Sequence, residues 1–203
     1  LFFYCIFYNL MNLNCVYCIK RKCDLLWHNF SGQNLNWHKA KLIIDSFLRN
    51  VLKDRKILTI GFSGGEPLIK FDLIKKIVAY SKIKAGKNKK LIRFNITTNL
   101  ILLTEESVKF FRKEKFLIGV SLDGLKASND RTRIYKNNKG TFDDVMENVD
   151  LLLRCVPAKR ITLSATISEN NFRFLNIKFL KLVKNLGIKK VSLEVDSVNP
   201  LSF

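Results

Sequence analysis

Three of the five cysteines lie close together near the start of the chain: Cys15, Cys18 and Cys23. Two thiolates in a C-x2-C arrangement can bind one metal ion or one edge of an iron–sulfur cluster. With Cys23 and His28, the run also resembles a zinc knuckle whose last two ligands are exchanged, a module that binds single-stranded RNA. The run lacks the glycines that let a knuckle turn tightly, which favours another kind of metal site. Because no secretory signal is read, we expect a reducing compartment rather than disulfides.

Two further groups of polar residues directly follow apolar, strand-like runs. Residues 63–67, Ser-Gly-Gly-Glu-Pro, contain glycines that permit close approach of the backbone to a ligand, and Glu66 can accept hydrogen bonds from an ammonium group. Ser121 and Asp123 stand two residues apart, where strand alternation would place both side chains on one face, as suits the hydroxyls of a ribose. In isolation, each segment is also explained by a plain turn, with Pro67 near a helix start or Asp-Gly in a loop.

Strand-like and helix-like segments alternate along the whole chain and position these groups. Parallel pairing is expected because a helix lies between each successive pair of strands, and both a doubly wound sheet and a barrel fit this pattern. In either architecture ligands lie at the carboxyl ends of the strands, so we expect the polar loops to share one rim. The expected strands are residues 2–8, 57–62, 91–96, 116–122, 161–167 and 190–195. The expected helices are residues 37–52, 71–83, 142–153 and 172–186, with one further helix that begins after Thr104. Thr104 and Thr141 are expected to cap the helices that follow them, and Ala85-Gly86 to stop the helix of residues 71–83.

Length and composition favour one globular domain. The chain has 203 residues, of which 47% are hydrophobic, enough for a single sizeable core. Its net charge of +19 comes mostly from lysines spread over every helix-like segment, which indicates solvated helix faces and does not favour nucleic acid as a partner. No apolar run reaches the roughly 20 residues that a membrane span needs. We therefore expect a cytoplasmic protein without a membrane partner.

Read in order, these motifs resemble the radical S-adenosylmethionine (SAM) superfamily over nearly the whole chain. Residues 11–18, M-N-L-N-C-V-Y-C, are similar to the cluster loop C-N-L-x-C-x-Y-C, and residues 63–67 to the G-G-E-P motif. Residues 97–104 resemble a T-T-N-G-x-L-L segment, with Leu100 in place of the glycine. The S-L-D-G, H-D-x-x-R and G-T-F run of peptide- and protein-modifying members, including the anaerobic sulfatase-maturating enzymes, is similar to residues 121–124, 129–133 and 140–142.

The resemblance implies an α/β fold, a partial (β/α)6 TIM-like barrel formed as a single domain by residues 1–203. It also implies two cofactors: a 4Fe-4S cluster held by three cysteines, and SAM, which the cluster cleaves to methionine and a 5′-deoxyadenosyl radical. The implied partners are a peptide or protein substrate and a reducing electron donor such as flavodoxin or ferredoxin. By matching position, Cys15 and Cys18 would bind the cluster, and the SAM-binding residues would be Tyr17, Gly64, Gly65, Glu66, Asn99, Ser121, Asp123 and Arg133.

The roles within this set also follow from the resemblance. The segment from Gly64 to Glu66 would bind the SAM amino group, Ser121 and Asp123 its ribose, and Arg133 its carboxylate, which a guanidinium matches in geometry. No catalytic side chain beyond the cofactor ligands is read.

Besides Leu100, the sequence departs from the family pattern in three further respects. Met11 replaces the first cluster cysteine, and a thioether is a weaker iron ligand than a thiolate; Cys23 is the nearest substitute and Cys5 a poorer one. Asn129 replaces the usual histidine, and we expect the chain to lack the Cys-rich SPASM or twitch extension of peptide-modifying relatives. We therefore expect an oxidoreductase of the peptide-maturase type with weakened radical chemistry. A non-catalytic barrel that binds SAM or a peptide, and a basic zinc- or RNA-binding module, remain as alternatives.

Overall fold

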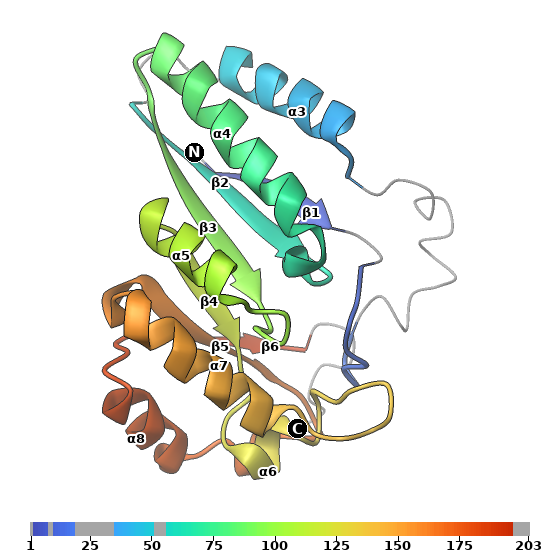
Figure 1. Ribbon diagram of the computed structural model, residues 1–203. Coiled ribbons are helices and arrows are strands. Elements are labelled where there is room, and N and C mark those ends of the chain that lie inside the picture. The colour runs from blue at the N-terminus through green and yellow to red at the C-terminus, as the bar shows by residue number, and fades with distance from the viewer. Residues whose placement is uncertain (1, 8–9, 19–34, 51–55, 197–203) are drawn as a thin grey trace.

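The computed structural model describes residues 2–7, 10–18, 35–50 and 56–196 (Figure 1). Six strands form one sheet in chain order, each pairing in parallel with the next. They are β1 Phe2–Phe7, β2 Ile57–Gly64, β3 Leu91–Thr98, β4 Leu117–Ser121, β5 Ile161–Ile167 and β6 Val191–Val195.

The helices that connect these strands lie together on one face of the sheet (Figure 1). A doubly wound sheet would carry helices on both faces, whereas strictly sequential strands with helices outside them form part of a β/α barrel. The predicted fold class, an α/β partial (β/α)6 TIM-like barrel, is confirmed. The helices are α3 Trp37–Asn50, α4 Phe71–Lys87, α5 Glu105–Lys113, the short α6 Lys126–Asn129, α7 Phe142–Cys155 and α8 Ile177–Asn185, with 3-10 turns at Pro67–Lys70, Ala158–Arg160 and Phe172–Phe174.

Stacked aromatic side chains fill the core between the middle strands and α5. The rings of Phe62, Phe94 and Phe116 stack with centroids 5.4–6.4 Å apart, and all three are at most 2% exposed. Phe111 of α5 packs against Phe116 at 5.0 Å. The predicted cap of α5 is confirmed, since Thr104 forms a reciprocal capping box with Ser107. The frame beneath the carboxyl ends of β2, β3 and β4 is therefore tightly packed.

Some predicted element ends are wrong. The strands β2 and β3 each run two residues further than predicted, so residues 63–64 and 97–98 are strand rather than loop. The helix α4 continues through the predicted stop at Ala85-Gly86, because Ala85 packs in the core at 2% exposure. Apart from its chain neighbours and the backbone of its own helix, no atom of the described residues lies within 4 Å of the position that a Cβ on Gly86 would take, so the surroundings do not require glycine there. It ends at Lys87, where the Asn88 amide donates to the Lys84 carbonyl at 2.8 Å.

The N-terminal cap of α7 and the start of α8 also differ from the prediction. Thr141 precedes α7 as expected, but its hydroxyl donates to the Arg133 carbonyl at 2.9 Å and makes no cap. Asp130 takes the cap instead by accepting from the Phe142 N–H at 2.9 Å. The helix predicted over residues 172–186 starts only at Ile177, after a separate 3-10 turn.

Leu100, which stands where the family has glycine, combines backbone strain with complete burial. Its φ is +62° and its side chain is 0% exposed. The left-handed conformation costs a non-glycine residue about 1 kcal/mol, whereas removing a fully buried leucine side chain costs about 3–5 kcal/mol. We therefore expect Leu100→Gly to lower the free energy of unfolding by roughly 2–4 kcal/mol in urea titrations. Leu102→Ala, at a side chain 39% exposed, is the control; a Leu100→Gly protein as stable as the parent would contradict this balance.

Candidate functional site

The segment of residues 10–18 crosses the carboxyl edge of the sheet and is joined to the loops that follow three strands. Its first residue, Leu10, accepts from the Glu66 N–H after β2. The Asn12 side chain accepts from the Asn99 amide after β3 at 2.9 Å. Beyond β4, the Asn14 N–H donates to the Ile134 carbonyl at 2.8 Å, and the Val16 N–H donates to the Thr132 carbonyl at 2.9 Å. Segments far apart in sequence thus meet on one rim of the sheet, as was predicted from the position of the polar loops after the strands.

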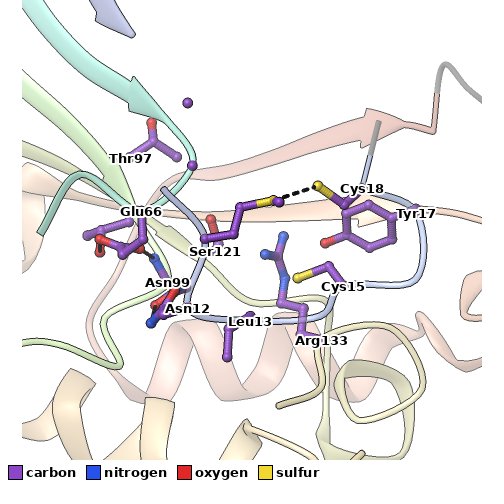
Figure 2. Close-up of a pocket in the computed structure, with 14 residues that line it drawn as sticks. Asn12, Leu13, Cys15, Tyr17, Cys18, Glu66, Thr97, Asn99, Ser121 and Arg133 are labelled. Carbon is purple, nitrogen blue, oxygen red and sulfur yellow. Dashed lines mark hydrogen bonds between the residues drawn. The ribbon is translucent and has the colours of Figure 1, made fainter. Parts of the chain in front are cut away.

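A cavity of about 180 Å³ opens between these segments (Figure 2). Its lining also includes Asn12, Leu13, Thr97 and Thr98, which lie in the predicted motif segments but were not predicted to bind a ligand. Asp123 does not line the cavity, and Cys23 and the Cys5 side chain lie outside the described residues. The predicted site residues that the structure brings together there are Met11, Cys15, Tyr17, Cys18, Gly64, Gly65, Glu66, Asn99, Ser121 and Arg133.

The sulfur atoms at one end of the cavity form an incomplete set for an iron–sulfur cluster. The Cys18 thiol contacts the Met11 thioether at 3.6 Å, the dashed line in Figure 2, and Cys15 lines the same cavity. Burial raises the pKa of the Cys15 thiol, and the Arg133 guanidinium offsets this only in part. Among the described residues, no three His, Cys, Asp or Glu side chains converge on a metal position. Two thiols and a thioether do not fit the three-thiolate pattern of the family.

Glu66 lies at the other end of the cavity and is held by three protein donors. Its Oε1 accepts from the Thr98 hydroxyl at 2.7 Å and from the Leu68 N–H at 3.0 Å, while Oε2 accepts from the Asn99 N–H at 2.9 Å. Burial, with 1% of the residue exposed, nevertheless raises the pKa of this carboxyl group. A carboxylate has about four acceptor positions, so one remains for a cationic group of a ligand. Gly64, at φ +119°, ends β2 in a conformation that favours glycine and turns the chain toward Glu66.

Asp123 does not line the cavity and is 0% exposed. Its Oδ2 accepts from the Tyr17 hydroxyl at 2.8 Å and the Thr132 hydroxyl at 2.7 Å. Its Oδ1 accepts from the Thr166 N–H at 2.8 Å and lies 3.1 Å from the Arg133 guanidinium. The carboxylate therefore joins the cysteine segment, the loop after β4 and the end of β5.

Arg133 and Tyr17 form one wall of the cavity (Figure 2), and both contact the buried Asp123 carboxylate. The Arg133 guanidinium carbon lies 5.5 Å from the centre of the Tyr17 ring. Burial works against the charge of Arg133, but the Asp123 carboxylate outweighs it and the pKa of the guanidinium is raised. Burial also raises the pKa of Tyr17, so its hydroxyl remains a proton donor. This wall presents a permanent positive charge to the cavity.

Asn129, in the position of the family's histidine, is part of the scaffold rather than of the cavity. It is 0% exposed, accepts from the Asp123 N–H at 3.2 Å and donates to the Thr141 hydroxyl at 3.1 Å. Gly140 is required beside it, because a Cβ there would lie 2.1 Å from Cγ of Asp130. The run from Asn129 to Thr141 thus fixes the backbone from which Arg133 projects.

Comparison with known proteins agrees with this architecture. The family model of the radical SAM superfamily matches residues 6–172. The chain is 31% identical over 187 residues to an uncharacterized protein of Methanocaldococcus jannaschii, covering 92% of this chain and 59% of that protein. It is 31% identical over 144 residues to a cysteine-type anaerobic sulfatase-maturating enzyme of Clostridium novyi, covering 70% of this chain and 37% of the enzyme.

A solved structure of native anSMEcpe with bound AdoMet superposes with a TM-score of 0.78 at 21% identity, covering 98% of this chain and 52% of that one. At this identity the likeness shows the fold. The chain spans only part of the length of the relatives it matches. In the part of the chain that the structure describes, no helix has the length and apolar character to cross a membrane.

Proposed function

The chain belongs to the radical SAM superfamily, and from this premise we propose that it binds SAM in the cavity at the carboxyl ends of β2, β3 and β4 and acts as the core of a peptide- or protein-modifying enzyme. Members of this family use a 4Fe-4S cluster to cleave SAM reductively to a 5′-deoxyadenosyl radical. The observation that carries the proposal is the convergence of Glu66, Ser121 and Arg133 on one cavity beside the two cysteines.

The chemistry of the lining residues supports SAM as the ligand. The unfilled acceptor position of Glu66 suits the amino group of the methionyl part, and the guanidinium of Arg133 suits its carboxylate. The Ser121 hydroxyl, at the end of β4, suits a hydrogen bond with a ribose hydroxyl, and the absence of side chains on Gly64 and Gly65 suits a ligand beside their backbone. These side chains bind and orient the ligand.

The sulfur set supports a weaker cluster than that of three-cysteine relatives. Met11 offers a neutral thioether where the family supplies a thiolate, and soft but uncharged sulfur binds iron poorly. We therefore assign SAM binding to the chain as it stands, together with slower reductive cleavage of SAM than in relatives with three cluster cysteines. Replacing Met11 is the direct test of this assignment.

The proposed substrate class rests on the relatives. Two of them are cysteine- and serine-type anaerobic sulfatase-maturating enzymes, and the solved anSMEcpe structure also exists with a bound Cp18Cys peptide. By this analogy we assign a peptide or protein substrate and a reducing electron donor. Residues 1–203 would form the radical SAM core of such an enzyme.

The test is anaerobic purification followed by metal analysis, calorimetric titration with SAM, and detection of 5′-deoxyadenosine after addition of dithionite. We expect about one SAM bound per chain and iron well below the four atoms of a complete cluster. A protein that does not bind SAM would refute the proposal, and stoichiometric zinc would support the zinc-binding alternative instead.

A further inference from the structure

The charges around the cavity do not by themselves match a cationic ligand. Only two charged side chains line it in the described part of the chain, Glu66 and Arg133, and their charges cancel. SAM carries a carboxylate, an ammonium and a sulfonium group, and therefore a net charge of +1. A cavity of zero net charge in a protein of net charge +19 offers this ligand no electrostatic complement.

Asp123 supplies the missing negative charge from behind the wall. Its carboxylate lies 3.1 Å from the Arg133 guanidinium and is fully buried, so solvent screens it little. With Asp123 included, the two carboxylates exceed the one guanidinium by a single negative charge. The local charge then complements that of the ligand.

The hydrogen bonds of Asp123 leave no place for a ribose hydroxyl. Each carboxylate oxygen already has two donors: Tyr17 and Thr132 on Oδ2, and Thr166 and Arg133 on Oδ1. These fill about four acceptor positions, and Asp123 is absent from the cavity lining. The arrangement fixes Arg133, whose buried Nε has no partner among the described residues and remains a donor for a ligand.

We propose that Asp123 is a positioning residue that neutralises and orients Arg133, and so allows the cavity to accept a sulfonium cation, rather than a ligand of the ribose. This inference rests on the proposed binding of SAM. Without the Asp123 charge, the guanidinium can still attract a carboxylate, but it also repels the sulfonium. Asp123 therefore controls the preference for SAM over an uncharged thioether analogue.

The test compares two ligands, SAM and S-adenosylhomocysteine, which share the adenosine, carboxylate and ammonium groups and differ at the sulfonium. In calorimetric titrations of the metal-free protein, Asp123→Asn should weaken SAM binding roughly tenfold more than S-adenosylhomocysteine binding, as expected for one charge at this range in a partly shielded site. A ribose ligand or a purely structural residue would weaken both ligands by the same factor. An equal loss for the two ligands would therefore overturn the inference.

Variants with matched charges sharpen the comparison. Thr132→Val removes one hydrogen bond from the same carboxylate without changing any charge, so the ratio of the two affinities should stay at the parent value. Arg133→Gln should shift the ratio of the two affinities toward SAM, because it removes the positive charge. This variant keeps three hydrogen-bond donors on Asp123, so it tests the inference even if Asp123→Asn does not fold. The double variant has the parent's net charge, and its ratio should return toward the parent's. A parent protein that binds neither ligand would instead refute the proposed function.

Discussion

The Met11→Cys variant is expected to raise the iron content of the anaerobically reconstituted protein from a low level toward the four atoms of a 4Fe-4S cluster. The Met11 side chain already lies at the cavity, 3.6 Å from the Cys18 thiol and in the same lining as Cys15. The substitution therefore places a third thiol in a segment that the fold has already positioned. A thiolate adds a negative charge and a strong iron ligand where the thioether offers neither. Iron analysis and the visible spectrum measure the change, and 5′-deoxyadenosine release after reduction measures its consequence.

The control is Met11→Leu, which keeps the bulk of the side chain and removes its sulfur. This variant should hold no more iron than the parent. Equal iron and equal SAM cleavage in the cysteine variant and the parent would mean that the first ligand position is not what limits the cluster. Cys23→Ser in the parent then shows whether Cys23 substitutes for that ligand, because any residual cluster should be lost with it.

The architecture was predictable from sequence because each β/α unit carries its own signals. Apolar runs separated by amphipathic helices require parallel neighbours, and the order of the strands follows from short connections. Helix ends were less predictable, since packing outweighs local preference. Gly86 is a reasonable stop by propensity, yet α4 continues past it because Ala85 packs in the core. The alternation of strands and helices in the sequence could not distinguish a barrel from a doubly wound sheet, because that distinction depends on whether the helices lie on one face of the sheet or on both.

The contacts of Asp123 beside the cavity wall could not be predicted from the sequence. Strand alternation placed Ser121 and Asp123 on one face, but β4 ends at Ser121 and the alternation ends with it. Asp123 instead turns into the interior, where its partners come from residues 9 and 43 positions further along the chain and from the cysteine segment. No local pattern contains those partners. The family resemblance named both Arg133 and Asp123, but it assigned Asp123 to the ribose rather than to the guanidinium that this carboxylate contacts.

Glu66→Gln is expected to weaken SAM binding roughly 10- to 100-fold, as expected for the loss of a charged hydrogen bond of about 1.5–3 kcal/mol. The amide keeps the shape of the side chain but loses the charge that would attract the SAM ammonium group. It also places a donor near the Asn99 or Leu68 N–H, so the fold of the variant is checked by its urea unfolding. Glu105→Gln, at an exposed carboxylate of α5 paired with Lys109, is the matched control and should bind SAM like the parent.

The raised pKa of Glu66 gives this carboxylate a recognisable pH signature. Burial raises that pKa above the ordinary value of 4.5, so the folded protein holds the proton at pH values where the unfolded chain has lost it. The contribution of Glu66 to the free energy of unfolding therefore falls as the pH rises from 4.5 to the raised pKa, and is constant above it. SAM binding has the opposite sign, because an ammonium ligand prefers the ionised carboxylate and its affinity rises with pH in the same window. Glu66→Gln should lose both dependences together, and a variant with the parent's pH profile of SAM affinity would show that another group binds the ammonium.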